Sequence, residues 1–223
     1  MEIAELNLKT IQQKLSEIQD NSDPKFLIAD SLKPEDEEYN LLSPFKVGYS
    51  QTREQQFLFY NSLYDFDVFK HSIIDIGCGR SDLYGYLSEL YPSSIIKYTG
   101  IDSDPEMFEL TKQKYNFEII QSDFMDVDGI TADFVLASGI FTTTKFENET
   151  SSINSMLKSI DKLYSMSNFA VSFNLLTSKN NHKHDGYLFI NPGKVIDKLI
   201  KKYTYVNVYH NYSDNIYTIV IFK

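Results

Sequence analysis

The sequence predicts an α/β fold built on an open, mostly parallel sheet with helices on both faces. A short apolar run at residues 73–76 breaks into Gly77-Cys78-Gly79, and a helical pattern then starts near Asp82. Strand-like and helix-like segments alternate after that point, and the chain closes with two strand patterns separated by a polar turn. A buried strand, a tight glycine turn and a helix N-terminus form the nucleotide-binding corner of such sheets.

Length and composition fit one such domain with an N-terminal extension. The chain has 223 residues, and its hydrophobic content of 42% is enough for a full core. A net charge of −10 disfavours a nucleic-acid partner, which calls for a basic surface. Cys78 is the single cysteine, so no disulfide framework is expected. Without a long apolar stretch or a signal-peptide pattern, we expect a soluble, cytoplasmic protein with no membrane contact.

The first part of the chain is predicted to be helical. Residues 2–19 place apolar side chains at helical spacing, and the polar run at residues 20–24 ends the pattern. We therefore expect an N-terminal helical extension at residues 1–45 and a ligand-binding domain at residues 46–223. The extension can pack on the domain's own surface, close over a ligand as a lid, or form a dimer contact. The sequence leaves these roles open, and with them the choice between monomer and dimer.

Two nucleotide ligands compete for the glycine corner. The dinucleotide fingerprint G-x-G-x-x-G needs a glycine at position 82, where this chain has Asp82. The positive end of a helix dipole normally binds the pyrophosphate of a dinucleotide. Here the carboxylate of Asp82 would stand at that helix start and repel the pyrophosphate. S-adenosylmethionine (SAM) has no phosphate and carries a sulfonium and an ammonium group. The acidic loop therefore favours SAM over NAD.

The segment IIDIGCGRSD resembles motif I of the class I SAM-dependent methyltransferases, D/E-x-G-x-G-x-G. Asp75, Gly77 and Gly79 match the motif, and Ser81 stands in place of the third glycine, a role that serine can fill if its φ is negative. The resemblance assigns this loop, Cys78 included, to cofactor binding. It also implies a Rossmann-like, seven-stranded sheet of order 3-2-1-4-5-7-6 that ends in an antiparallel hairpin.

The resemblance extends over residues 47–223. The strings VGYSQTREQQ, ASGIF, SFNLLTS and HNYSDNIYTIVIFK are similar to an uncharacterised bacterial and phage group of these methyltransferases. Residues 47–66 are predicted to form a helix, with a capping box at its start. In the family a helix here flanks the SAM pocket, which implies that Tyr49 and Arg53 meet the methionine end of the ligand. Arg53 would bind its carboxylate, although a solvated surface position for Arg53 stays open.

The second strand is predicted to end in Asp102. Apolar residues at helical spacing after the glycine loop predict the first sheet helix, which Pro92 closes. Asp104 is a predicted N-cap and Pro105 a first-turn residue of the following helix. A carboxylate at the tip of the second strand accepts both ribose hydroxyls of an adenosine, and Ser103 adjoins it. Because the same acid serves NAD, this position predicts a nucleoside without choosing between the two ligands.

The exits of the third and fourth strands complete the predicted site. Asp123 and Phe124 follow a strand at residues 117–121, and the resemblance implies that they hold the adenine amine and lie beside its ring. Ser138 and Gly139 follow a strand at residues 132–137, at the exit that faces the transferred methyl in these enzymes. The motif D/N-P-P-Y/F/W is missing there, which disfavours methylation of exocyclic amines of bases or of glutamine amides. The lack of a Pro-Cys pair likewise disfavours cytosine-ring methylation.

In the rest of the chain we expect, in order, a helix at residues 150–166, a strand at 168–177, a loop at 178–186, a helix at 192–202 and an antiparallel hairpin at 203–210 and 216–222.

His182 and His184 in the loop at residues 178–186 are weak candidates for a general base. Together with Asp185 they do not make a convincing metal site, because ligands so close in sequence on a loop are weak evidence, and no metal is expected.

The sequence therefore predicts a SAM-dependent methyltransferase that transfers a methyl group to an oxygen or nitrogen of a small or medium acceptor. Such transfer is an in-line displacement that depends mainly on alignment, so an obvious catalytic residue is not required. Three alternatives stay open: a non-catalytic SAM-binding sensor or assembly protein, a nicotinamide-dependent oxidoreductase, and a methyltransferase that acts on nucleic acid.

Overall fold

The apolar run of the glycine corner forms a central strand of a mixed sheet. The computed structural model describes residues 71–90, 97–142, 149–179, 187–210 and 216–223. In chain order, the described elements are β1 (Ile73–Ile76), α4 (Asp82–Leu90), β2 (Tyr98–Asp102), α5 (Pro105–Lys114), β3 (Glu118–Gln121), η4 (Phe124–Asp126), β4 (Ala132–Ala137), α6 (Glu149–Met166), β5 (Ser167–Thr177), β6 (Phe189–Ile190), α7 (Pro192–Leu199), β7 (Tyr205–Tyr209) and β8 (Ile216–Phe222).

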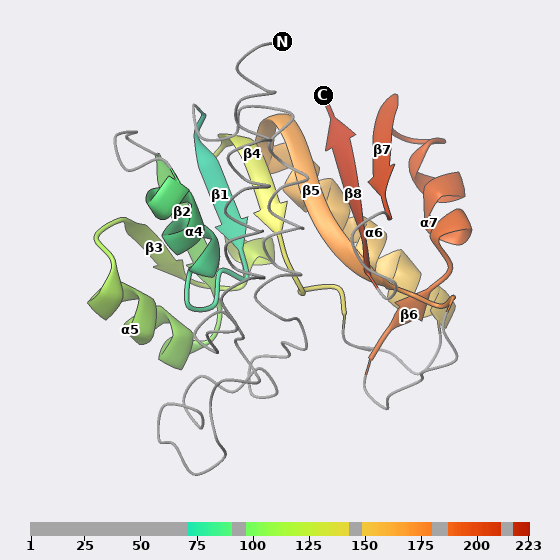
Figure 1. Cartoon of the computed structure of the whole chain (residues 1–223). Helices are drawn as coiled ribbons and strands as arrows, with labels where there is room; N and C mark the ends of the chain where they lie inside the picture. The colour runs from blue at the N-terminus through green and yellow to red at the C-terminus, as the bar shows by residue number, and fades with distance from the viewer. Residues whose placement is uncertain (1–70, 91–96, 143–148, 180–186, 211–215) are drawn as a thin grey trace, which may run out of the picture. The chain divides into compact units, whose positions relative to one another are not determined.

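The strand order is β3-β2-β1-β4-β5-β8-β7 (Figure 1). Strands β1 to β5 run parallel, whereas β8 is antiparallel to both β5 and β7. This arrangement confirms the predicted mostly parallel sheet with its C-terminal antiparallel hairpin. The sheet also contains β6, which pairs with the end of β5 and raises the number of strands from the predicted seven to eight. A strand of two residues shows no period in the sequence, so nothing predicted it.

Helices cover both faces of the sheet. In Figure 1, α4 lies in front of the sheet and α6 behind it. The core on the α6 side joins alternate residues of the strands to the apolar stripe of that helix: Ile74, Ile76, Val135, Val171, Phe173, Ile153, Ile160 and Leu163. Each is 4% exposed or less, and burying such a side chain stabilises the fold by about 1.5–3 kcal/mol. Helix α7 adds Val195 and Leu199 to the same core.

An aromatic cluster holds α4 against the opposite face. The ring of Tyr84 on α4 lies 5.2 Å from Tyr98 of β2, 5.0 Å from Tyr115 and 4.5 Å from Phe117. Close aromatic pairs, of which the two between tyrosines are edge-to-face, add about 0.5–1.5 kcal/mol each beyond their buried area. Because α4 follows the glycine loop directly, this cluster also helps to fix where that loop lies.

Several predictions fall outside the described residues. They concern the helices at residues 2–19 and 47–66, the boundary between residues 45 and 46, Tyr49, Arg53, His182 and His184. The described residues all belong to a unit that spans residues 67–223. None of the helices in those described ranges is long and apolar enough to cross a membrane.

Candidate functional site

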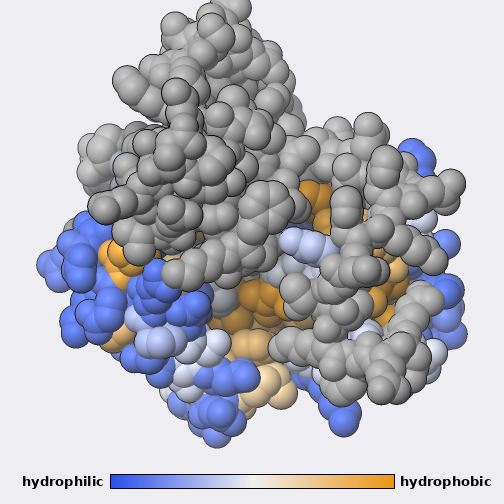
Figure 2. Space-filling view, turned by 90° about the horizontal axis from the view of Figure 1, so that it is seen from below, coloured by the Kyte–Doolittle hydropathy of each residue, from blue (hydrophilic) through white to orange (hydrophobic). Residues whose placement is uncertain are grey.

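The predicted site residues meet at one edge of the sheet. Gly77-Cys78-Gly79 follows β1, Asp102 ends β2, Asp123 follows β3, and Ser138-Gly139 follows β4. Because these strands are parallel neighbours, their carboxyl ends lie along the same edge, where open α/β sheets bind ligands. Figure 2 views the molecule from that side and shows an apolar area bordered by hydrophilic side chains.

The two glycines of the loop have different roles. Both have a positive φ, +65° at Gly77 and +52° at Gly79, which favours glycine over other residues. A Cβ on Gly77 would lie 2.5 Å from the side chain of Ile140, so the loop packs directly against the exit of β4. A Cβ on Gly79 would have no atom of the described residues within 4 Å. Gly77 is thus required for packing, whereas Gly79 leaves open space beside its backbone.

Ser81 does not meet the condition under which a serine can replace the third glycine. That condition is a negative φ, but Ser81 has a φ of +57° and is completely buried. The left-handed conformation costs a non-glycine residue about 1–2 kcal/mol. Its hydroxyl lies 3.5 Å from that of Thr111, which itself donates to the Gly79 carbonyl oxygen at 2.8 Å. Ser81 therefore adopts the left-handed backbone conformation that a third glycine would adopt, and its contacts with buried neighbours such as Thr111 offset the conformational cost.

Asp102 ties the glycine loop to the next helix. One carboxylate oxygen accepts from the Gly79 N–H at 2.7 Å, and the other accepts from the Asp104 N–H at 2.9 Å. Burial raises the pKa of Asp102 despite these hydrogen bonds. Asp104 caps α5 as predicted, accepting from the N–H of Glu106, with Pro105 in the first turn. Since each carboxylate oxygen accepts more than one bond, Asp102 can still bind a hydroxyl group.

Two of the predicted cofactor residues lie beneath the loop. Asp75 is buried and accepts a hydrogen bond from the hydroxyl of Tyr98. The sulfur of Cys78 packs toward β2, where a Cβ on Gly100 would lie 2.9 Å from it. Burial, reinforced by the nearby carboxylate of Asp75, raises the pKa of the Cys78 thiol, so the thiol stays neutral. The side chains of both residues support the loop from below.

Asp123 begins the short helix η4. Its Oδ1 accepts from the Met125 N–H at 2.9 Å, and its Oδ2 has no hydrogen-bond partner among the described residues. Asp123 is exposed, whereas Phe124 is half-buried and packs against the core. The sequence did not predict η4, but this turn presents one oxygen of Asp123 at the same edge as Asp102.

The exit of β4 is held by Asn174, a residue that the sequence analysis did not single out. Asn174 Oδ1 accepts from the Gly139 N–H at 2.8 Å, and Asn174 Nδ2 donates to Ser138 Oγ at 3.2 Å. Gly139 has a φ of +82°, and its carbonyl oxygen accepts from the hydroxyl of Thr142 at 2.6 Å. The available signal was an asparagine flanked by the apolar residues Phe173 and Leu175 in the buried part of β5.

Acidic and backbone groups dominate the described part of the site. Within the described ranges, no group of three or more His, Cys, Asp or Glu residues is arranged to hold a metal ion. The carboxylates of Asp102 and Asp123 can accept hydrogen bonds from hydroxyl or amine groups, and the backbone at Gly79 is open. This combination suits a nucleoside without phosphate.

Comparison with known proteins agrees with this geometry. A family model described as "Methyltransferase domain" matches residues 73–162. The Mycobacterium tuberculosis protein "Putative methyltransferase Rv1506c" is 30% identical over 157 residues, which are 68% of this chain and 93% of that protein. The chain therefore belongs to the class I SAM-dependent methyltransferases.

Solved structures share the fold at low sequence identity. Magnesium protoporphyrin IX methyltransferase (ChlM) from Synechocystis PCC 6803, with bound SAM, has a TM-score of 0.54 and 12% identity and covers 82% of this chain and 83% of its own. The plantazolicin methyltransferase BpumL, in complex with a pentazolic desmethylPZN analog and S-adenosylhomocysteine (SAH), has a TM-score of 0.54 and 17% identity over 83% and 87%. These similarities establish the fold and leave the acceptor open.

Proposed function

We propose that this chain binds SAM at the carboxyl edge of its sheet and transfers the methyl group to an oxygen or nitrogen of a small or medium acceptor. The observation that carries the proposal is the Asp102 carboxylate at the tip of β2, held 2.7 Å from the backbone of the open Gly79. The SAM and SAH bound in the structural relatives support the same ligand.

The residues along the edge suit the parts of the ligand in order. Asp123 accepts from the adenine amine through its unpaired oxygen, with Phe124 beside the ring. Asp102 accepts from the ribose hydroxyls, and Gly79 lets the ligand approach the backbone. Ser138 and Gly139 follow on the far side of β1, toward the end of the ligand that carries the methyl group. Ser103 is exposed next to Asp102.

The charge at this edge favours SAM over a dinucleotide. Asp102 and Asp104 lie within one turn, at the end of β2 and the start of α5. A pyrophosphate would place negative charge among these acids, whereas the sulfonium and ammonium groups of SAM carry positive charge. The formal charge of −10 over the whole chain likewise favours a small acceptor over nucleic acid.

The chemistry requires alignment above all. A lone pair of the acceptor attacks the methyl carbon as the carbon–sulfur bond breaks, and the bonding electrons return to sulfur to give the neutral thioether of SAH. A rigid site that holds the nucleophile in line lowers the barrier by removing the entropy cost of the encounter. A general base is needed only for an acceptor that must lose its proton first, and His182 and His184 stay the predicted candidates for that role.

Calorimetric titration of the full chain with SAM, SAH and NADH tests the proposal. We expect saturable binding of SAM and SAH, no binding of NADH, and at least a tenfold loss of SAM affinity in Asp102→Ala, which removes hydrogen bonds to a charged group. Asp104→Ala is the matched control for charge, because it removes the neighbouring carboxylate that caps α5 and leaves the one proposed to bind the ribose. It should therefore weaken SAM binding less than Asp102→Ala does. Binding of NADH without SAM would contradict the proposal. SAM binding without turnover in a labelled-methyl acceptor screen would favour the non-catalytic alternative.

A further inference from the structure

Asn174 is a polar residue at a fully buried position of β5. Its exposure is 0%, and its strand neighbours Phe173 and Leu175 are equally buried. Burying an amide is costly unless its donors and acceptors are paired. Asn174 meets this requirement by bonding to two successive residues at the exit of β4, Ser138 and Gly139. The Asn174 side chain thus fixes the conformation of the residues that follow β4.

Chemistry alone determines how the amide is oriented. The backbone N–H of Gly139 can only donate, so the atom of Asn174 that faces it must be the carbonyl oxygen Oδ1. The amide nitrogen then faces Ser138 and donates to its hydroxyl oxygen. Because Ser138 Oγ accepts this bond, its own hydrogen is left to donate elsewhere. Among the described residues, none accepts a hydrogen bond from it.

The polar groups of Gly139 are already used. Its N–H donates to Asn174, and its carbonyl oxygen accepts from both the hydroxyl and the backbone N–H of Thr142, at 2.6 and 3.3 Å. The carbonyl oxygen of Thr142 in turn accepts from the Leu188 N–H at 2.8 Å. The backbone groups of Gly139 are therefore used within the protein, and the Ser138 hydroxyl is a group left available to a ligand.

The order of the site indicates which ligand group reaches Ser138. If Asp123 holds the adenine and Asp102 the ribose, the ligand runs from β3 across β2 and β1 toward β4. The exit of β4 lies against the glycine loop through Ile140 and Gly77. The amino-acid end of SAM then falls at Ser138. Its ammonium group can only donate, so the one group there that can accept from Ser138 is the carboxylate.

We propose that Asn174 is a positioning residue that holds the Ser138 hydroxyl as a hydrogen-bond donor to the carboxylate of SAM. This inference rests on the proposed function and adds a specific role for two residues at the methionine end. Asn174 makes no contact with the ligand. It acts by keeping the hydroxyl hydrogen of Ser138 directed away from itself.

The Asn174→Asp variant turns this role into a pH-dependent one. A protonated carboxyl accepts from Gly139 and donates to Ser138, as the amide does. Once ionised, it can only accept, so Ser138 must donate to it and is lost to the ligand. We expect the SAH affinity of Asn174→Asp to equal that of the native protein at low pH and to fall about tenfold below it as that carboxyl ionises, the size of one hydrogen bond to a charged group. Calorimetry at a series of pH values measures the ratio.

Three further variants separate positioning from stability. Ser138→Ala should bind SAH about tenfold more weakly but bind 5′-methylthioadenosine, which lacks the amino-acid end, as the native protein does. In Ser138→Ala combined with Asn174→Asp, the pH-dependent loss should disappear. Ser172→Ala is the matched control, since Ser172 lies on the same face of β5, is 1% exposed and has a hydroxyl with no hydrogen-bond partner in the described part of the chain. It should bind SAH normally.

The outcomes distinguish this inference from the proposed function. A native protein that fails to bind SAH contradicts the proposed function. Native binding with an Asn174→Asp ratio that does not change with pH, or with Ser138→Ala at native affinity, overturns the inference. Hydrogen exchange of the Gly139 amide checks the fold of the ligand-free protein. We expect protection in Asn174→Asp and its loss in Asn174→Leu, which cannot accept from that amide.

Discussion

At the scale of single residues, Ser81 shows how strain is held in the glycine loop. It adopts a φ of +57° in a fully buried position. Ser81→Gly removes the conformational cost, and Ser81→Ala keeps that cost while removing the same hydroxyl. We expect Ser81→Gly to be more stable than Ser81→Ala by about 1 kcal/mol, measured by urea denaturation. Equal stability of the two variants would show that the left-handed conformation costs little here.

The residues that the sequence predicted at the site share one property. Asp75, Gly77, Gly79, Asp102 and Asp123 each stand in a predicted strand or within three residues after one. Local sequence shows such positions, because glycines and acids interrupt apolar runs. Ser81 and Asn174 were different cases. The φ of Ser81 depends on its burial beside Thr111. The role of Asn174 depends on Gly139, which follows a neighbouring strand and lies 35 residues earlier in the chain. Neither relation is visible in local sequence.

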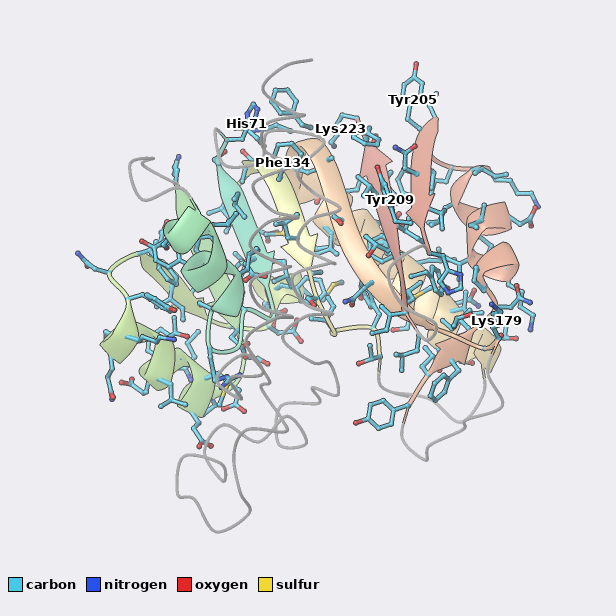
Figure 3. All side chains as sticks on the ribbon, in the orientation of Figure 1. His71, Phe134, Lys179, Tyr205, Tyr209 and Lys223 are labelled. Atoms are coloured by element: carbon cyan, nitrogen blue, oxygen red, sulfur yellow. The ribbon has the colours of Figure 1, made fainter. Side chains whose placement is uncertain are left out.

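At the scale of elements, a polar clamp joins β1 to β4 at the edge opposite the glycine loop. Asp133 Oδ2 accepts from the backbone N–H and the hydroxyl of Ser72, both at 3.0 Å, and lies 3.5 Å from His71 Nδ1. Figure 3 shows His71 and Phe134 together at this edge, where their rings lie 5.4 Å apart. Burial alone would raise the pKa of Asp133, but the hydrogen bonds from Ser72 outweigh it and lower that pKa.

This clamp predicts a pH-dependent contribution to stability. Since the pKa of Asp133 is lower in the folded than in the unfolded chain, its contribution is present above the unfolded value of about 3.9 and disappears as the pH falls through the folded value. We expect Asp133→Asn to lose about 1 kcal/mol at pH 7 and to approach the native stability in acid. Urea denaturation at both pH values measures this.

The control for the clamp is a second aspartate with a surface ion pair. Asp128 lies 2.6 Å from Lys162, and its side chain is 91% exposed. Exposed pairs contribute little because water and salt screen them, so Asp128→Asn should leave the stability unchanged at both pH values. If both variants lost stability equally at pH 7 and in acid, the assigned role of Asp133 would be wrong.

Most elements were predictable because their periods are strong. Helix α6 begins one residue before its predicted start and ends where predicted, and β8 has its predicted bounds. Helix α7 ends at Leu199 and not at residue 202, because the chain turns after Ile200. The short elements β6 and η4 were missed. Their hydrogen bonds to distant or capping groups, and not a repeating pattern, determine them.

At the scale of the whole molecule, the net charge predicts how the two forms of the ligand differ. SAM carries one net positive charge, whereas SAH carries none, and the chain carries −10. Screening shortens electrostatic attraction to about 10 Å at 0.1 M salt. We expect added potassium chloride to weaken SAM binding by on the order of threefold while SAH binding changes little. Parallel calorimetric titrations at low and high salt measure this, and an equal loss for both ligands would contradict it.

Strand β8 has a consequence for how the chain folds during synthesis. It lies between β5 and β7, although β7 precedes it in the chain. Among the described strands, β7 pairs with β8 alone, so β7 leaves the ribosome before its partner exists. Until residues 216–222 emerge, β5 also presents an unpaired edge, the kind of surface at which nascent chains associate wrongly. The segment made after β7 therefore both pairs that strand with the sheet and covers the exposed edge of β5.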